Sequence, residues 1–202
     1  IGSLFNFTAN ASHSQNTLTH VMTVTLPELT LNMNRIYPLK NIGNPAKKRW
    51  YKDLYISYTA NAKNYMSMAD SLYFKPNWLN NLQNGIQHRV PVSMPVKLFK
   101  HITWTTSATL LDRMYFRYFE KEWVNDPSMP NGGYLKTDTI NQFRNVFSFD
   151  VSSSLTTKLY GQVNFRKGPI RAIRHVFTPS IGLSYNPDFS KGFWNYYDTY
   201  YD

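Results

Sequence analysis

Residues 147–165 read FSFDVSSSLTTKLYGQVNF, and this stretch decides the fold. Large apolar side chains such as Phe147, Phe149 and Val151 occupy odd positions, while small or polar side chains occupy even ones. A period of two places alternate side chains on opposite faces of a β-strand. Roughly 9 to 11 residues cross a bilayer as a tilted strand, whereas a soluble strand usually has about 5 to 6. The stretch therefore predicts one long, unbroken strand with an apolar face and a polar face.

The same alternation recurs along the rest of the chain in other runs. These runs cover residues 5–12, 17–33, 54–63, 86–96, 102–110 and 179–185. The tripeptide SQN, residues 14–16, is expected to link the first two runs, and a change of parity at Pro27 indicates a β-bulge. Together with residues 147–165, the runs predict about seven strands.

Alternating strands fit two environments, a soluble sheet with one buried face and a membrane barrel whose outer face contacts lipid. Aromatic residues make up 16% of the chain and charged residues only 17%, with a mean hydropathy of -0.45. Many Tyr, Asn, Thr and Ser with few charges are expected when half of each strand is apolar and the other half is uncharged but polar. No run of about 18 apolar residues occurs, which excludes a helical membrane span.

The lengths of the connections also favour the barrel. Residues 39–49, 97–100 and 166–170 form the shorter links, and they alternate with longer ones at 64–84 and 122–139. Short links at one rim and long loops at the other are typical of an outer-membrane barrel, and such long loops are uncommon in compact soluble domains. We therefore predict an all-β fold, a segment of an antiparallel transmembrane β-barrel.

The net charge of +10 favours an anionic partner, for which nucleic acid, phospholipid headgroups and phosphorylated glycolipid are candidates beside a merely solvated basic surface. The sequence has no Cys, and its five His residues form no metal-binding pair. No nucleophile motif, glycine-rich phosphate loop or pair of carboxylates is evident either. We therefore expect no enzymatic activity, no metal and no cofactor.

Three segments resemble a known family. Residues 26–40 (LPELTLNMNRIYPLK), 85–110 and 159–189 are similar to the barrel of LptD, the lipopolysaccharide-assembly protein of outer membranes, in its Bacteroidetes form. The most specific element is a periplasmic turn followed by Arg174, His175, Pro179 and a strand rich in Ser and Tyr. KKRWY, residues 47–51, similarly looks like the periplasmic turn that leads into the third strand.

The resemblance implies a translocon in the outer membrane of a Gram-negative bacterium. Such a barrel is plugged by an LptE-like lipoprotein, receives lipopolysaccharide from periplasmic bridge proteins, and releases it sideways through a lateral gate into the outer leaflet. Seven strands are too few for this barrel. We therefore expect residues 1–202 to be part of a single barrel domain, with the remaining strands and an N-terminal periplasmic domain outside this sequence.

The alternation divides the candidate residues between two environments, the hydrated lumen and the membrane lipid. The lumen-facing candidates are Ser148, Asp150, Ser152, Thr156, Lys158, Ser180 and Ser184. The lipid-facing candidates are Phe147, Phe149, Val151, Leu155, Ile181 and Leu183. Arg166, Arg171 and Arg174 are expected at the periplasmic rim, where they either anchor the barrel or contact lipid phosphates. For the lumen hydroxyls, wetting of a large cavity is the alternative to specific contact with lipid. Trp50, Trp104, Tyr115 and Tyr118 are expected in an interfacial aromatic girdle, with a platform that stacks on sugar rings as the alternative.

Two other functions stay open on the residues alone. A different outer-membrane barrel, such as a nutrient transporter or porin, would use the same alternation for solute passage. A soluble basic β domain would bind glycan or nucleic acid through exposed rings and would need no detergent. The resemblance favours lipopolysaccharide and outer-membrane lipid as partners, and no nucleic acid.

Overall fold

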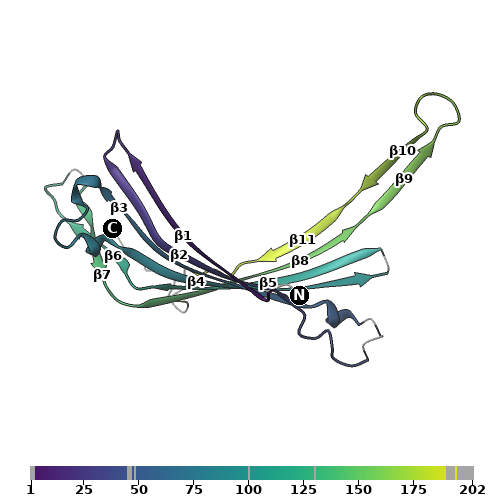
Figure 1. Cartoon of the computed structure of the whole chain (residues 1–202), viewed down its shortest axis with the longest axis horizontal. Helices are drawn as coiled ribbons and strands as arrows, with labels where there is room; N and C mark the ends of the chain where they lie inside the picture. The colour runs from purple at the N-terminus through teal and green to yellow at the C-terminus, as the bar shows by residue number, and fades with distance from the viewer. Residues whose placement is uncertain are drawn as a thin grey trace.

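The computed structural model describes residues 3–44, 47, 49–99, 101–129, 131–189 and 194. Seven strands form one antiparallel sheet in the order β1-β2-β3-β4-β5-β8-β11 (Figure 1). They are β1 (Phe5–Asn16), β2 (Val21–Ile36), β3 (Tyr55–Ala69), β4 (Gln83–Leu98), β5 (Ile102–Tyr115), β8 (Arg144–Thr157) and β11 (Ser180–Tyr185). Lys48, within the predicted turn 47–51, lies outside the described residues.

Two separate hairpins and three short 3₁₀ helices complete the described elements. β6 (Tyr118–Asn125) pairs with β7 (Gly133–Ile140), and β9 (Leu159–Asn164) pairs with β10 (Ala172–Phe177). The 3₁₀ helices are η1 (Trp50–Asp53), η2 (Asp70–Leu72) and η3 (Trp78–Asn81). No helix in the described ranges has the length and apolar character needed to cross a membrane.

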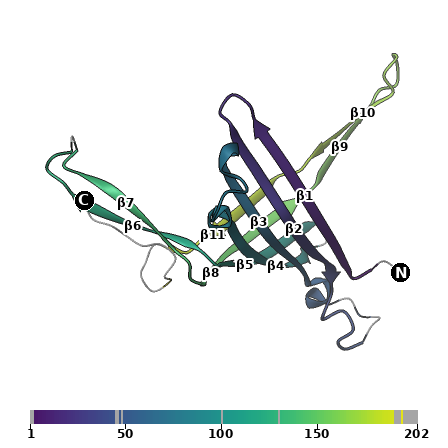
Figure 2. The same cartoon turned by 60° about the vertical axis from the view of Figure 1, so that its left-hand side comes forward.

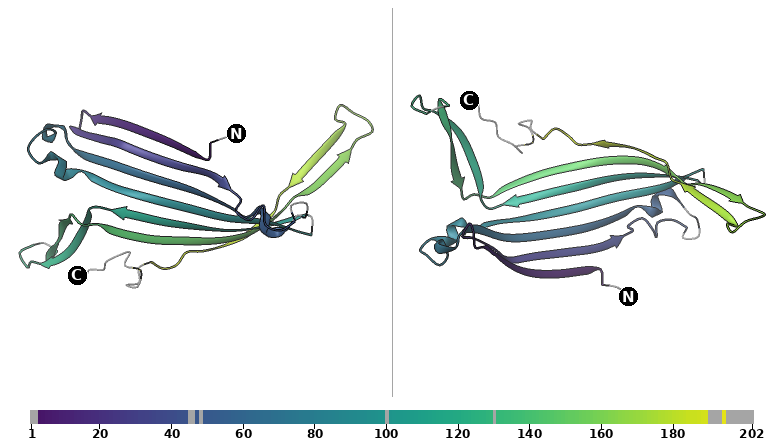
Figure 3. Two further views of the ribbon diagram at one scale, coloured as in Figure 1. Left: turned by 60° about the horizontal axis from the view of Figure 1, so that its bottom comes forward. Right: turned by 90° about the horizontal axis from the view of Figure 1, so that it is seen from above.

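The sheet is open at both sides. β1 and β11 form its two edges, and the ordered row of strands between them is visible in Figure 3. An edge strand leaves a row of backbone N–H and C=O groups without ladder partners. The seven strands therefore form a curved wall rather than a closed barrel.

A protein core is nearly absent from the described residues. Met66, Tyr73 and Val146 are the only hydrophobic side chains among them that are buried. Phe147 is 44% exposed, and Ile181 and Leu183 are 71% and 81% exposed. A soluble sheet covers its apolar face with a second layer, and none of the described elements supplies one here. Hydrocarbon is the solvent that suits such a face.

The strand predicted over residues 147–165 is interrupted. β8 passes through Ser152 and Leu155 without a turn, but it ends at Thr157, and Lys158 separates it from β9. The prediction of one unbroken strand was therefore wrong at Lys158. The neighbouring β5 pairs with β8 only as far as Ile102 opposite Thr157. Beyond that point β9 pairs with β10 and with no other described strand, and this hairpin leaves the sheet (Figure 2).

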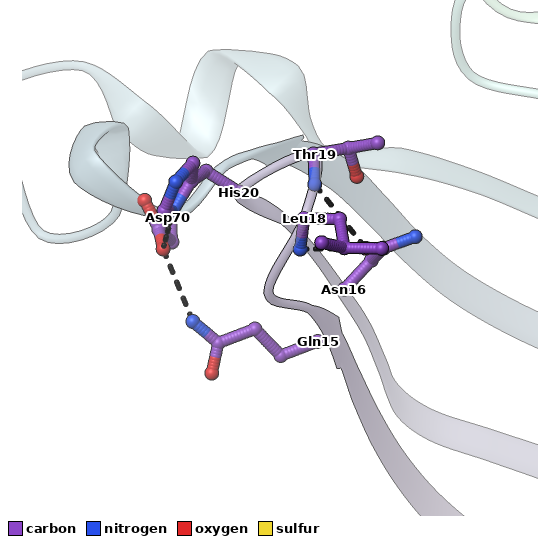
Figure 4. Close-up of polar contacts among 6 residues, drawn as sticks. All are labelled: Gln15, Asn16, Leu18, Thr19, His20 and Asp70. Carbon is purple, nitrogen blue, oxygen red and sulfur yellow. Dashed lines mark hydrogen bonds and ion pairs between the residues drawn. The ribbon is translucent and has the colours of Figure 1, made fainter.

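The first hairpin turn lies later than SQN. Residues 14–16 belong to β1, and the turn is formed by residues 17–20. Asn16 determines this position, because its side-chain oxygen accepts hydrogen bonds from the backbone N–H of Leu18 at 3.0 Å and of Thr19 at 3.2 Å (Figure 4). Gln15 and the backbone of His20 both bond to Asp70 at the end of β3, so the turn is fixed to its neighbour.

The bulge predicted at Pro27 is confirmed. The pairing of β2 with β3 shifts register between Thr25 and Glu28, and the pairing of β1 with β2 shifts between Asn10 and Ser12. After the shift Leu29, Leu31 and Met33 face the same side as Met22 and Val24 before it. The bulge therefore keeps the apolar face continuous across the change of parity.

The connections do not divide into short and long rims as predicted. Residues 17–20, 70–82 and 116–143 connect strands at one rim, here called the Asp70 rim. Residues 37–54, 99–101 and 158–179 connect strands at the opposite rim, here called the Trp50 rim. Each rim carries both a short connection and a projecting hairpin, β6–β7 at the Asp70 rim and β9–β10 at the Trp50 rim (Figure 2).

Replacing Gly133 by alanine is expected to loosen the β6–β7 hairpin. A Cβ at this position would overlap the carbonyl oxygen of Val124 and lie 3.0 Å from the Trp123 ring. Relief of that overlap separates the two strands and lowers the stability of the hairpin by about 1 to 3 kcal/mol. Hydrogen exchange of the β6–β7 amides measures the effect. Gly161→Ala in β9 is the control, since nothing lies within 4 Å of its Cβ position, and equal protection in the two variants would contradict the predicted overlap.

Candidate functional site: two faces of one sheet

The register of the seven strands sorts the side chains onto two faces. Opposite residues in an antiparallel ladder point to the same side. Phe149 pairs with Leu110, and Val151 pairs with both Ala108 and Tyr185. Ala108 pairs in turn with Val92, and Val92 with Ile56. One side of the sheet is thus apolar from β11 to β3, and we call it the apolar face.

The other side is rich in hydroxyl and amide groups, and we call it the polar face. Ser107 pairs with Ser152 and Ser93, and the hydroxyls of Ser93 and Ser107 lie 3.0 Å apart. Asn61 donates hydrogen bonds to Thr30 at 2.8 Å and to Glu28 at 3.3 Å. These side chains bond to one another across strands, and single charges such as Glu28, Arg89 and Asp150 lie among them on the polar face.

The predicted site residues fall on these faces as their parity requires. Ser148, Asp150, Ser152 and Thr156 of β8 share the polar face with Ser180 and Ser184 of β11. Phe147, Phe149, Val151 and Leu155 share the apolar face with Ile181 and Leu183. Lys158 belongs to neither strand, because it lies at the break between β8 and β9.

Some polar side chains interrupt the apolar face. Ser153 lies on it and accepts a hydrogen bond from the Trp104 indole N–H at 2.7 Å. Nearer the Asp70 rim, the hydroxyl of Tyr58 lies 2.7 Å from His88 Nδ1, and Asp112 is the register partner of His88. Oδ1 of Asp112 is buried without a hydrogen-bond partner in the described part of the chain. The alternating pattern did not predict that Tyr58, His88 and Asp112 would lie together on this face.

The three arginines predicted at the periplasmic rim lie on or beside the β9–β10 hairpin. Arg174 is in β10, where its guanidinium carbon lies 5.0 Å from the centre of the Tyr160 ring. Arg166 and Arg171 lie in the connection between β9 and β10. They are therefore carried by a projecting hairpin rather than by a short turn.

Charge is distributed unevenly between the rims. The connections of the Trp50 rim contain eleven Lys or Arg residues and a single acid, Asp53. Those of the Asp70 rim contain four Lys or Arg and five Asp or Glu. In the β6–β7 turn of the Asp70 rim, hydrogen bonds from the hydroxyl and the backbone N–H of Ser128 lower the pKa of Asp126. The excess positive charge is thus concentrated at the Trp50 rim.

The aromatic girdle is only partly as predicted. Trp104 lies on the apolar face toward the Trp50 rim, as a girdle residue would. Tyr115 pairs with Gly85 and Arg144 on the polar face, so its assignment to a lipid-facing girdle was wrong. Tyr115 and Tyr118 line a cavity of about 500 Å³ at the Asp70 rim.

Within the described residues no group of three or more His, Asp or Glu side chains could hold a metal ion. The features that do stand out are an uncovered apolar face, a hydroxyl-rich polar face and two unpaired edges. Together they define a wall segment of an outer-membrane β-barrel.

The family follows from a comparison of sequences. The family model described as LptD protein matches residues 1–202, and the chain belongs to this family. LptD proteins are outer-membrane components of Gram-negative bacteria that act in lipopolysaccharide transport and assembly rather than as enzymes. The comparisons with curated proteins and with solved structures gave no match.

Proposed function

We propose that this chain forms part of the wall of a lipopolysaccharide translocon, with its polar face lining a hydrated lumen. Residues 1–202 belong to one barrel domain, and further strands close it. The observation that carries the proposal is a polar face rich in hydroxyl and amide side chains from β2 to β11, back to back with an apolar face. Phe147, Ile181 and Leu183 on that apolar face are exposed, and the Phe189 and Trp194 rings pack on Phe149 alone among the described ring contacts of this face. Family membership supports it.

Sugar and phosphate groups need a path that hydrates them without holding them. The hydroxyls of Ser107 and Ser152, which are half-buried on the polar face, offer neutral hydrogen bonds of modest strength, about 0.5 to 1.5 kcal/mol each in net terms. The apolar face keeps Phe147, Leu155 and Leu183 in contact with acyl chains of the membrane. Lipopolysaccharide can therefore pass along the wall while water fills the rest of the lumen.

We assign the Trp50 rim to the periplasmic side, and three of its residues to the entry of the lipid. The charge excess of this rim and the resemblance of residues 47–51 to a periplasmic turn support the assignment. Arg166, Arg171 and Arg174 then meet lipid phosphates where periplasmic bridge proteins deliver them. An LptE-like lipoprotein plugs the lumen, and the barrel releases lipopolysaccharide through a lateral gate into the outer leaflet.

Photocrosslinking tests the assignment of the faces. A photoreactive side chain at Asp150 or Ser152 is expected to form adducts with lipopolysaccharide in the assembled barrel, because both positions point into the proposed lumen. At Phe149 on the apolar face the same group is expected to capture bulk phospholipid. Immunoblotting for lipopolysaccharide after irradiation measures the difference.

The reverse pattern would overturn the proposal. Phospholipid adducts at Ser152, or none at either lumen position while Phe149 still reacts, would mean that lipopolysaccharide does not pass along this face. A nutrient transporter or porin would give that second result. Release of the chain into buffer without detergent would instead indicate a soluble β domain.

A further inference from the structure

A cavity of about 500 Å³ opens at the Asp70 rim of the sheet. β3, β4 and β5 contribute polar-face residues to it, among them Asn61, Lys63, Gln87 and Arg113. The segment that leaves β5 and enters β6 adds Arg117, Tyr118 and Phe119. This volume is within the range of about 300 to 1,000 Å³ that is usual for small-ligand sites.

The cavity is cationic, although its rim as a whole is not. Lys63, Arg113 and Arg117 line it, and the described lining includes no carboxylate. The nearest acid in register is Glu28, the ladder partner of Lys63, which accepts a hydrogen bond from Asn61. Three cations in one hollow with no lining acid favour an anionic ligand.

Arg117 adds a specific donor. One terminal nitrogen of its guanidinium donates a hydrogen bond to the Leu82 carbonyl at 3.3 Å, which ties the side chain to the end of the β3–β4 connection. Its Nε is buried and has no hydrogen-bond partner among the described residues. A buried donor without a partner is costly, and a ligand oxygen would satisfy it.

Aromatic rings alternate with these cations. Tyr65 and Tyr115 line the cavity, and the Lys63 ammonium lies 5.6 Å from the centre of the Tyr65 ring. The guanidinium carbon of Arg144 lies 5.0 Å from the centre of the Tyr118 ring. A tyrosine ring offers an apolar surface and a hydroxyl, which suits the apolar face and the hydroxyl rim of a pyranose.

We propose that this cavity binds the phosphorylated sugar of a glycolipid that has travelled along the polar face. Lys63, Arg113 and Arg117 contact the phosphate, and Tyr65 and Tyr115 contact the sugar ring. The inference rests on the proposed function and assigns the binding step to one end of the wall. Away from the cavity, the described polar face carries single charges such as Arg89 and Asp150 among Ser and Thr hydroxyls, so the glycolipid is held at the group of three cations and mainly solvated along the rest of the path.

The test measures binding of a deacylated, phosphorylated glucosamine disaccharide to the assembled barrel in detergent. Lys63→Gln is expected to weaken binding about fivefold, since a charge contact from an exposed side chain is worth at most about 1 kcal/mol. Lys97→Gln is the matched control, because Lys97 lies on the same polar face toward the Trp50 rim and the charge change is identical. The control should bind within about twofold of the unmodified barrel. Unchanged mobility of unboiled samples shows that each variant is folded.

Three comparisons decide the outcome. The dephosphorylated disaccharide should bind at least about tenfold more weakly, and inorganic phosphate alone should compete only weakly, because it lacks the ring contacts. Equal losses in Lys63→Gln and Lys97→Gln, or no loss in either, overturn the cavity as the site. If lipopolysaccharide still crosslinks at Ser152 in that case, the proposed function stands without the subsite. If that crosslink is also absent, the proposed function itself fails.

Discussion

Replacing Val151 by arginine is expected to lower the free energy of unfolding of the assembled barrel by about 2 to 4 kcal/mol. Val151 lies on the apolar face near the middle of β8, and its register partner Ala108 lies near the middle of β5. A guanidinium at that depth meets hydrocarbon, where its charge loses hydration that the neighbouring Phe149 and Ala108 side chains do not replace.

The adjacent position gives the matched control. Ser152→Arg introduces the same side chain one residue further along β8, on the polar face. There the guanidinium stays in water, so the change in unfolding free energy should be within about 0.5 kcal/mol. Reversible urea unfolding in lipid vesicles, followed by tryptophan fluorescence, measures both variants. Similar losses at the two positions would mean that the two faces meet the same solvent, and the membrane assignment would be wrong.

A polypeptide of residues 1–202 produced alone is expected not to fold stably in lipid. Every backbone group inside hydrocarbon needs a partner within the protein, and each unsatisfied one costs several kcal/mol. β1 and β11 each present one unpaired side along their length. These edges together would outweigh the stability of a typical domain, about 5 to 15 kcal/mol.

Limited proteolysis and mobility on unboiled gels give the measurement. Residues 1–202 alone should be degraded and should run at one mobility whether boiled or not. The same strands joined to the rest of the barrel should be protected and heat-modifiable. A protected, heat-modifiable monomer of residues 1–202 would contradict this expectation, since β1 and β11 would then have to pair with each other. A protected oligomer would show that copies of the chain satisfy the edges.

Much of the wall could be predicted from the sequence because its signal is local. Each strand meets two different solvents, so parity alone assigns Ser152 to one face and Val151 to the other. The bulge at Pro27 could be predicted for the same reason, since the apolar residues change from even to odd positions there. Once the register of two paired strands is known, the backbone hydrogen bonds between them follow from it.

The errors lie where pairing or a single side chain outweighs alternation. The first turn lies later than predicted because the side-chain oxygen of Asn16 accepts hydrogen bonds from the backbone N–H groups of Leu18 and Thr19. β8 ends at Thr157, opposite Ile102, the residue at which the neighbouring β5 begins, and a periodic pattern carries no information about where a neighbouring strand begins or ends. Leu111 is an apolar residue on the polar face, so the predicted fifth strand ended at Leu110, the cavity residue Arg113 was missed, and Tyr115 was placed in a girdle instead of in the cavity.

The direct pairing of β5 with β8 has a consequence for how this protein can vary between species. The ladder runs without a gap from Ile102 opposite Thr157 to Tyr115 opposite Arg144, so the entire β6–β7 segment is an excursion that the wall does not need. In the orientation proposed above, the outer turn around Ser128 points away from the periplasm, and substitutions there leave the β5–β8 ladder intact. The sequence of this outer turn can therefore change faster than the sequences of β5 and β8.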